Sequence, residues 1–262
     1  FIYWYLNNLG ERKTMSKIPD ILWLNTSPSL KVFNQRLIRY LSRKVLIAEW
    51  DYLQTPDEPC LLDIAVTLLH DYLKSINRPI HLIGHSTSGL VGLIYARKYP
   101  ERVKSLTLLS VGVHPTVDWQ AHYYVHRHLL PCSRETILRN MVKSLFGEQG
   151  RKVTQNLVKI LERDLDLSPS PHSLLKRQSM VPREVSVPLM ICGSCDDTII
   201  DPNLIQGWQP FLKSEDRIWE CPEGGYFFHH FSPLNVAQPL LEFWQENSFV
   251  LSNVTIPQAI AS

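Results

Sequence analysis

The feature that most constrains the fold of this chain is an alternation between short apolar runs and segments with helical periodicity. The runs are nearly continuously hydrophobic, which is typical of parallel strands buried on both faces by helices. Apolar residues between the runs recur at helical spacing, which indicates amphipathic helices. We therefore predict an α/β fold with a doubly wound, mostly parallel sheet of about six strands. The six runs cover residues 21–24, 45–50, 80–83, 103–111, 187–192 and 217–221.

Residues 114–184 interrupt this alternation with helical stretches that prolines and glycines separate. We expect this segment to be a helical lid inserted between two strands, above the strand ends where open α/β sheets bind ligands. The alternative is a peripheral helical layer without substrate contact. The core is then expected to comprise residues 15–113 and 185–248.

Composition excludes several function classes. The net charge of the 262 residues is only +2 and the basic residues are scattered, so no nucleic-acid partner is expected. No apolar run reaches the ~18 residues that a membrane span requires. Five cysteines, an odd number spread over a long chain, do not form a disulfide framework, and we expect a cytoplasmic protein. These features do not predict an oligomeric state.

One apolar run passes directly into a tight turn and a helix, in the segment from Ile80 to Leu90. A nucleophilic serine needs small neighbours, because its hydroxyl is lifted off the strand end in a strained conformation. Gly84, Ser88 and Gly89 supply them around Ser86. The Thr87 amide, at a helix N-terminus, is placed to stabilise an oxyanion.

The segment from Ile80 to Val113 resembles the nucleophile region of the α/β-hydrolase family. Its motif is G-x-S-x-G, and here Ser88 takes the place of the last glycine, a small residue for another. The resemblance extends from Ile21 to Gln245 and is strongest around Ser86.

The resemblance also implies positions for an acid and for the second oxyanion donor. The family order is serine, then acid, then histidine. The acid commonly lies three residues after the glycine that stands at Gly193 here, which is Asp196, and Asp197 is the competitor. The loop after residues 21–24 has Asn25-Thr26 where the family often has His-Gly, and its second oxyanion donor is expected to be the Ser27 amide.

The general base is the weakest part of the resemblance. The family's histidine usually follows a glycine shortly before the last helix, and Tyr226 stands at that position. A phenol with a pKa of about 10 is a poor base at neutral pH. His229 is the first candidate for a substitute and His230 the second, and a third possibility is that no histidine serves.

The resemblance implies hydrolysis of an ester or thioester of a small or medium organic acid through an acyl-Ser86 intermediate. Ser86, Asp196 and His229 would be the catalytic residues, Ser27 and Thr87 the oxyanion donors, and the partner a small-molecule substrate. No cofactor is implied. His122 and His126 have helical i, i+4 spacing, but no ligand set is completed, so no metal site is predicted. The alternative function is that of a catalytically impaired protein of the same fold that binds a ligand or a partner.

Overall fold

Six parallel strands form one sheet in the order β2-β1-β3-β4-β5-β6, as the alternation of apolar runs predicts. The computed structural model describes residues 18–53, 61–172 and 179–249. Residues 15–17 and 54–60 of the predicted core and 173–178 of the predicted insertion lie outside these ranges. The strands are β1 (Ile21–Asn25), β2 (Ile47–Asp51), β3 (Ile80–His85), β4 (Val103–Leu109), β5 (Leu189–Ser194) and β6 (Arg217–Cys221).

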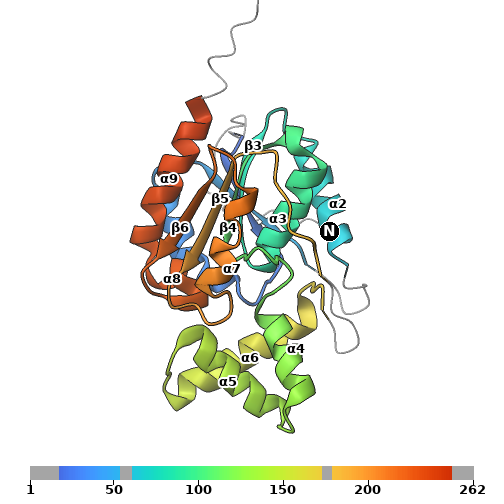
Figure 1. Ribbon diagram of the computed structural model, residues 1–262, viewed down its shortest axis with the longest axis vertical. Coiled ribbons are helices and arrows are strands. Elements are labelled where there is room, and N and C mark those ends of the chain that lie inside the picture. Colours follow the sequence, from blue (N-terminus) through green and yellow to red (C-terminus); the bar gives the residue numbers. More distant parts are fainter. Residues whose placement is uncertain (1–17, 54–60, 173–178, 250–262) are drawn as a thin grey trace, which may run out of the picture.

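Helices cover both faces of the sheet, so the sheet is doubly wound (Figure 1). Alternate side chains of one strand serve the two cores, since successive residues of a strand point to opposite faces. In β1, Leu22 and Leu24 join the core under α2 and α3, while Ile21 and Trp23 join the core under α1 and α9. These four helices are α1 (Gln35–Leu41), α2 (Leu62–Leu73), α3 (Thr87–Lys98) and α9 (Pro233–Phe249).

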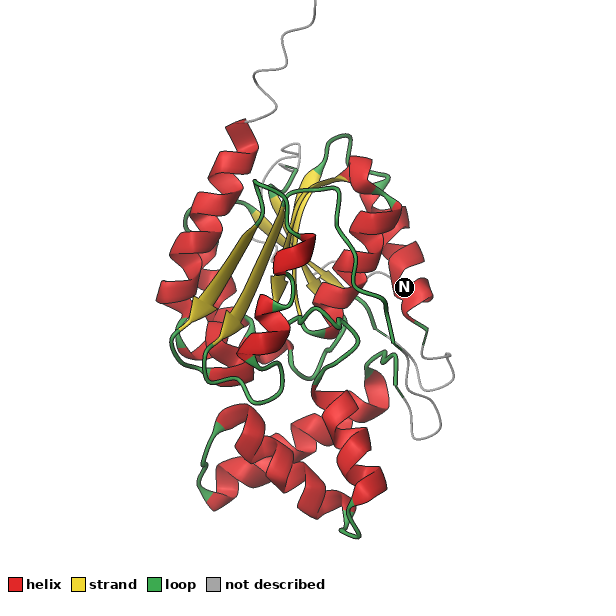
Figure 2. Ribbon diagram, in the orientation of Figure 1, coloured by secondary structure: helices red, strands yellow, loops and turns green. Residues whose placement is uncertain are grey.

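Three helices occupy the chain between β4 and β5 and form a separate layer at the carboxyl ends of the strands (Figure 2). They are α4 (Trp119–Leu129), α5 (Arg134–Phe146) and α6 (Arg151–Leu167). Buried Asp164 of α6 joins this layer internally, because its Oδ2 accepts hydrogen bonds from Trp119 Nε1 and Gln120 Nε2, both at 3.1 Å. The ring of Phe146, at the end of α5, stacks on Phe227 with centroids 4.9 Å apart, which joins the layer to the core.

Short elements lie in the loops that connect the strands and the larger helices. They are the short helices α7 (Pro202–Gln206) and α8 (Phe228–Phe231) and the 3-10 turns η1 (Lys31–Phe33), η2 (Pro100–Arg102), η3 (Gln209–Phe211) and η4 (Gly225–Phe227). Within the described ranges, no helix is both long and apolar enough to cross a bilayer.

Candidate active site around Ser86

Ser86 lies between the last residue of β3 and the first of α3, as the sequence predicts. Its backbone has φ 54° and ψ −127°, a region that non-glycine residues rarely adopt and that costs about 1–3 kcal/mol. The turn is possible only with glycines beside it. A Cβ on Gly84 would lie 2.6 Å from the Gly89 nitrogen, and one on Gly89 would lie 2.8 Å from the Gly84 oxygen. Strain and close packing together present the Ser86 side chain at the end of the strand.

Ser88, the residue that departs from the family motif, binds the loop after β1. Its Oγ accepts a hydrogen bond from the Thr26 amide at 2.9 Å and lies 3.0 Å from Thr26 Oγ1. The close approach to Gly84 is made by backbone atoms of Ser88 and Gly89 and not by the side chain at position 88, so a serine fits there. The substitution therefore fixes the loop that carries Ser27 instead of disrupting the turn.

The two predicted oxyanion donors remain available. Within the described residues, neither the Ser27 amide nor the Thr87 amide has a hydrogen-bond acceptor. Thr87 is the first residue of α3, where the helix dipole favours negative charge. Both amides are thus free to donate to a carbonyl oxygen.

Tyr226 is the residue that reaches Ser86. Its hydroxyl donates a hydrogen bond to Ser86 Oγ, and the Trp119 amide at the start of α4 lies near it. The side chain is fully buried. Burial raises the pKa of Tyr226 well above its ordinary value, and the nearby Asp118 carboxylate adds to the shift. The phenol is therefore protonated at neutral pH and acts as a donor toward Ser86, not as a base.

Asp196 holds the loop that carries Tyr226. Its carboxylate accepts hydrogen bonds from the amides of Gly224 at 3.2 Å and Gly225 at 2.8 Å, and from Ser194 Oγ at 2.6 Å. Burial alone would raise the pKa of Asp196, but these hydrogen bonds outweigh it and hold the pKa below its ordinary value. Asp196 is thus ionised and bonded to the backbone around the position where the family has its histidine.

Asp197, the competing acid, is buried just after β5. Its Oδ1 accepts hydrogen bonds from the amides of Ile199 at 2.8 Å and Ile200 at 3.1 Å. Its Oδ2 lies 3.5 Å from Ser110 Oγ, which donates to the Tyr226 carbonyl at 3.0 Å. Burial raises the pKa of Asp197 to about 7. Both aspartates therefore lie at the strand ends beside the Tyr226 loop, and neither accepts a hydrogen bond from a histidine within the described residues.

Within the described residues, His229 forms no hydrogen bond with Ser86. His229 Nε2 lies 2.9 Å from Asn34 Oδ1, and Asn34 Nδ2 donates to Asn25 Oδ1, also at 2.9 Å. The Asn25 amide in turn donates to the carboxylates of Glu49 and Asp51, which only accept. This chain of bonds makes Asn34 Oδ1 an acceptor, so His229 carries its proton on Nε2.

The other histidines near the site are also engaged. His85 Nε2 donates to the Tyr226 carbonyl at 2.8 Å, and His230 Nδ1 donates to the Phe33 carbonyl at 3.2 Å. His229 Nδ1 is buried without a partner in the described structure. Burial lowers the pKa of His229 well below its ordinary value, with a further contribution from His85. The centre thus has a serine and two amides but no imidazole hydrogen-bonded to the serine.

Asp118 belongs to this centre and was missed by the sequence analysis. Its Oδ2 accepts a hydrogen bond from Thr87 Oγ1 at 2.8 Å, and its Oδ1 caps α4 by accepting from the Ala121 amide at 2.8 Å. Burial raises the pKa of Asp118. An Asp one residue before the apolar Trp119 is an N-cap signal, but that signal does not reveal the contact with Thr87. In the part of the chain that the structure describes, no group of three or more metal-binding side chains is found.

Comparisons with known proteins agree with this geometry. A sequence model of the family described as "alpha/beta hydrolase fold" matches residues 73–147, which include the Ser86 turn. An uncharacterised protein of Nostoc sp. is 45% identical over 88% of this chain and 92% of its own length. Another, from Synechocystis sp., is 48% identical over 86% of this chain and 90% of its own length.

Solved structures with the same fold include hydrolases of several kinds. A serine hydrolase involved in carbazole degradation has a TM-score of 0.63 and 17% identity over 86% of this chain and 90% of its own. A bacterial membrane phospholipase A has a TM-score of 0.67 and 19% identity over 89% of this chain and 80% of its own. An epoxide hydrolase from Bacillus megaterium has a TM-score of 0.60 and 15% identity over 86% of this chain and 93% of its own. At these sequence identities, the comparisons show that the folds are alike and nothing more.

Proposed function

Because this chain belongs to the α/β-hydrolase fold family, we propose that its Ser86 centre binds an ester or thioester of a small or medium organic acid but turns it over poorly. The fold family consists predominantly of hydrolytic enzymes, and the solved neighbours include a serine hydrolase and a phospholipase. The observation that carries the proposal is the hydrogen bond from Tyr226 to Ser86 Oγ, made at the position where the family has its base.

Loss of the base impairs one step in particular. Attack by Ser86 Oγ on a carbonyl carbon requires the hydroxyl proton to pass to a neighbouring base as the new C–O bond forms. A protonated, buried phenol cannot take that proton. The amides of Thr87 and Ser27 could still hold the carbonyl oxygen, so binding is retained while acylation is slow.

The surroundings of the Tyr226 loop support binding of a small molecule. A cavity of about 550 Å³ lies beside the loop, lined by residues that include Phe146, Asp196, Gly225 and Phe231. We assign the segment 114–184 as a lid over this region, because Asp118 before α4 accepts a hydrogen bond from Thr87 and Phe146 of α5 stacks on Phe227. Movement of this layer would then uncover Ser86, which is 9% exposed.

Efficient hydrolysis is the second candidate function, favoured by the strained Ser86 backbone and the two free amides. In this case Ser86 attacks the carbonyl, His229 takes its proton and returns it to the leaving alcohol or thiol, and water then cleaves the acyl-serine. Asp196 would orient His229. This reaction requires His229 to leave Asn34 and Tyr226 to leave Ser86.

Ester hydrolysis by four forms of the protein separates the two candidates. We expect the kcat/KM of the wild type for p-nitrophenyl butyrate to be close to that of Ser86→Ala. Tyr226→His should raise it by roughly 10²–10⁴-fold, the usual contribution of a general base. His229→Gln should leave it unchanged. Calorimetric titration of Ser86→Ala with the intact ester should show saturable binding.

The opposite pattern would support efficient hydrolysis. A wild-type kcat/KM at least 10³-fold above that of Ser86→Ala, lost in His229→Gln, would reject the proposal and identify His229 as the base. Absence of saturable binding to Ser86→Ala would reject the binding function.

A further inference from the structure

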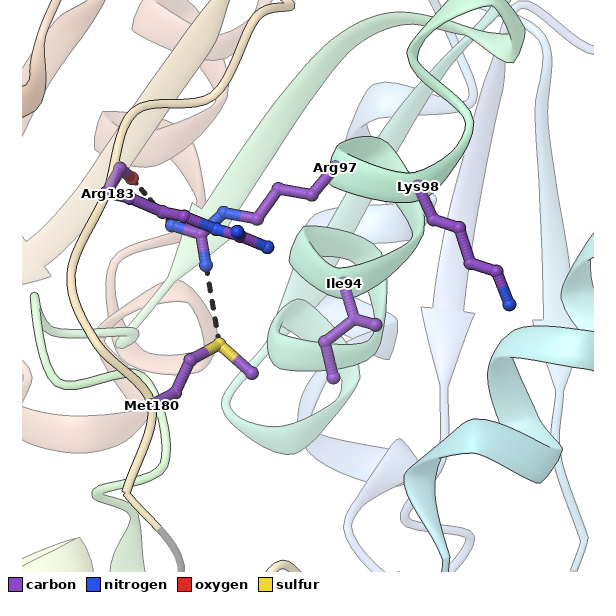
Figure 3. A pocket seen from close by; sticks show the side chains of 5 residues that line it. All are labelled: Ile94, Arg97, Lys98, Met180 and Arg183. Carbon is purple, nitrogen blue, oxygen red and sulfur yellow. Dashed lines mark hydrogen bonds between the residues drawn. The ribbon is translucent and has the colours of Figure 1, made fainter.

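A second cavity, of about 310 Å³, lies at the carboxyl-terminal end of α3, away from Ser86. It is lined by Ile94, Arg97, Lys98, Met180 and Arg183. Ten residues of helix separate Arg97 from Thr87, which corresponds to about 15 Å along the axis. Figure 3 shows Arg97 extending from α3 and Arg183 extending from the chain before β5 toward each other, while Lys98 points away from them.

The guanidinium group of Arg97 has fewer acceptors than it has donors. One terminal nitrogen donates to the Arg183 carbonyl oxygen at 2.6 Å. The other donates to the sulfur of Met180 at 3.3 Å, and a thioether is a weak acceptor. Arg97 Nε is buried and has no partner in the described structure. A buried donor without an acceptor is costly, so this group favours an additional acceptor.

The charges around Arg97 favour a bound acceptor that is negatively charged. No described carboxylate forms an ion pair with Arg97, Lys98 or Arg183. Burial lowers the pKa of Arg97 to about 10, and the positive charge of Arg183 contributes to this shift. Two like charges that face one cavity without a counter-ion repel each other, and a bound anion would relieve that repulsion.

The helix dipole explains only part of the arrangement. Cations in the last turn of a helix interact favourably with its carboxyl end, which accounts for Arg97 and Lys98. Arg183 is not part of that helix, so the dipole does not explain why a third cation lines the same cavity. The apolar side chains of Ile94 and Met180 complete the lining, and they suit a ligand with an aliphatic part.

We propose that this cavity binds a small aliphatic carboxylate, with its charged end between Arg97 and Arg183 and its chain against Ile94 and Met180. A planar guanidinium can hold a carboxylate through two parallel N–H···O bonds, and the exposed guanidinium of Arg183, beside Arg97, offers that geometry. The site is independent of the chemistry at Ser86.

Calorimetric titration of the full chain with hexanoate tests the site. We expect saturable binding that weakens as sodium chloride is raised, because the attraction is partly between charges. Arg183→Gln and Arg97→Gln should each raise the Kd at least tenfold. Lys44→Gln is the matched control, since it removes one positive charge from an exposed position outside the cavity lining, and it should change the Kd less than threefold. Arg183 is exposed, so Arg183→Gln keeps the test valid if Arg97→Gln fails to fold.

Two further ligands separate the contributions of charge and chain. Hexanol, which has the chain without the carboxylate, and inorganic phosphate, which has charge without a chain, should both bind at least tenfold more weakly than hexanoate. An unchanged Kd in Arg183→Gln, equal binding of hexanol or phosphate, or absence of hexanoate binding would overturn the proposal. None of these results would alter the expectations for ester hydrolysis at Ser86.

Discussion

The hydroxyl of Tyr226 donates a hydrogen bond to Ser86 Oγ, and the two residues are 140 positions apart in the chain. The Trp119 amide at the start of α4 lies near the same hydroxyl. The phenol thus lies where the nucleophile turn, the loop after β6 and the helical layer of α4–α6 meet. The group that replaces the base is therefore enclosed by all three elements.

Tyr226→Phe should destabilise the protein by about 0.5–1.5 kcal/mol, because it removes the buried hydrogen bond from the phenol to Ser86 Oγ. Urea unfolding of the variant and the wild type measures the difference. Tyr72→Phe is the control, since the Tyr72 hydroxyl donates no hydrogen bond to a described residue. Equal stability of wild type and Tyr226→Phe would show that the hydroxyl contributes nothing to the closed arrangement.

Gly84→Ala should destabilise the protein by about 1–3 kcal/mol or more, because the new Cβ would lie 2.6 Å from backbone atoms of Ser88 and Gly89 that cannot move independently. Gly150→Ala is the matched control, since a Cβ there meets nothing within 4 Å and the backbone φ is negative. Thermal unfolding of the two variants should separate them clearly. A Tm for Gly84→Ala equal to that of Gly150→Ala would contradict the close approach at the Ser86 turn.

Ser88→Gly restores the family motif but should still destabilise the protein, by about 1–3 kcal/mol. The serine Oγ is the acceptor for the buried Thr26 amide, and glycine leaves that amide without one. Ser88→Thr keeps a hydroxyl at this position and tests whether the bond or the small size matters. If denaturant unfolding gives Ser88→Gly a stability equal to or above that of the wild type, the bond to Thr26 is unimportant.

The sequence predicted the parts of this molecule that neighbouring residues encode. Apolar runs with few interruptions marked all six strands, and the small residues around Ser86 marked its turn, because both patterns reflect sterics within a few positions. The approach of Tyr226 to the nucleophile was implied by the resemblance to the family, whose histidine usually follows a glycine shortly before the last helix.

Partners that come together only in three dimensions were not predictable in this way. Nothing near His229 in the sequence indicates that Asn34, 195 positions away, holds its Nε2. The hydrogen bond between Thr87 and Asp118 likewise depends on how the α4–α6 layer docks on the core. Which residue a buried polar group binds is therefore decided by packing, and this is why the identity of the base stayed open at the sequence level.

The last prediction concerns pH. Burial raises the pKa of Asp197 to about 7, above the value of about 3.9 for an unfolded chain. Between these two values the unfolded state has lost a proton that the folded state retains. The Asp197 contribution to the free energy of unfolding therefore falls as pH rises from about 4 to about 7, by at most about 1.4 kcal/mol per pH unit, and is constant outside that window.

Asp197→Asn isolates this contribution. The amides of Ile199 and Ile200 both donate to Oδ1, and an asparagine oxygen can accept the same two bonds. We expect the variant and the wild type to be similar in stability at pH 4 and the variant to be more stable at pH 8.

Both proteins contain His85, whose pKa burial lowers to about 4. Its contribution cancels when stability is compared as the difference between the two proteins at each pH. Asp201→Asn, at the exposed N-cap of α7, serves as the control for loss of one negative charge. A difference in unfolding free energy that stays constant from pH 4 to pH 8 would show that folding does not raise the pKa of Asp197, so that at neutral pH it is available as a charged partner for a histidine at position 226.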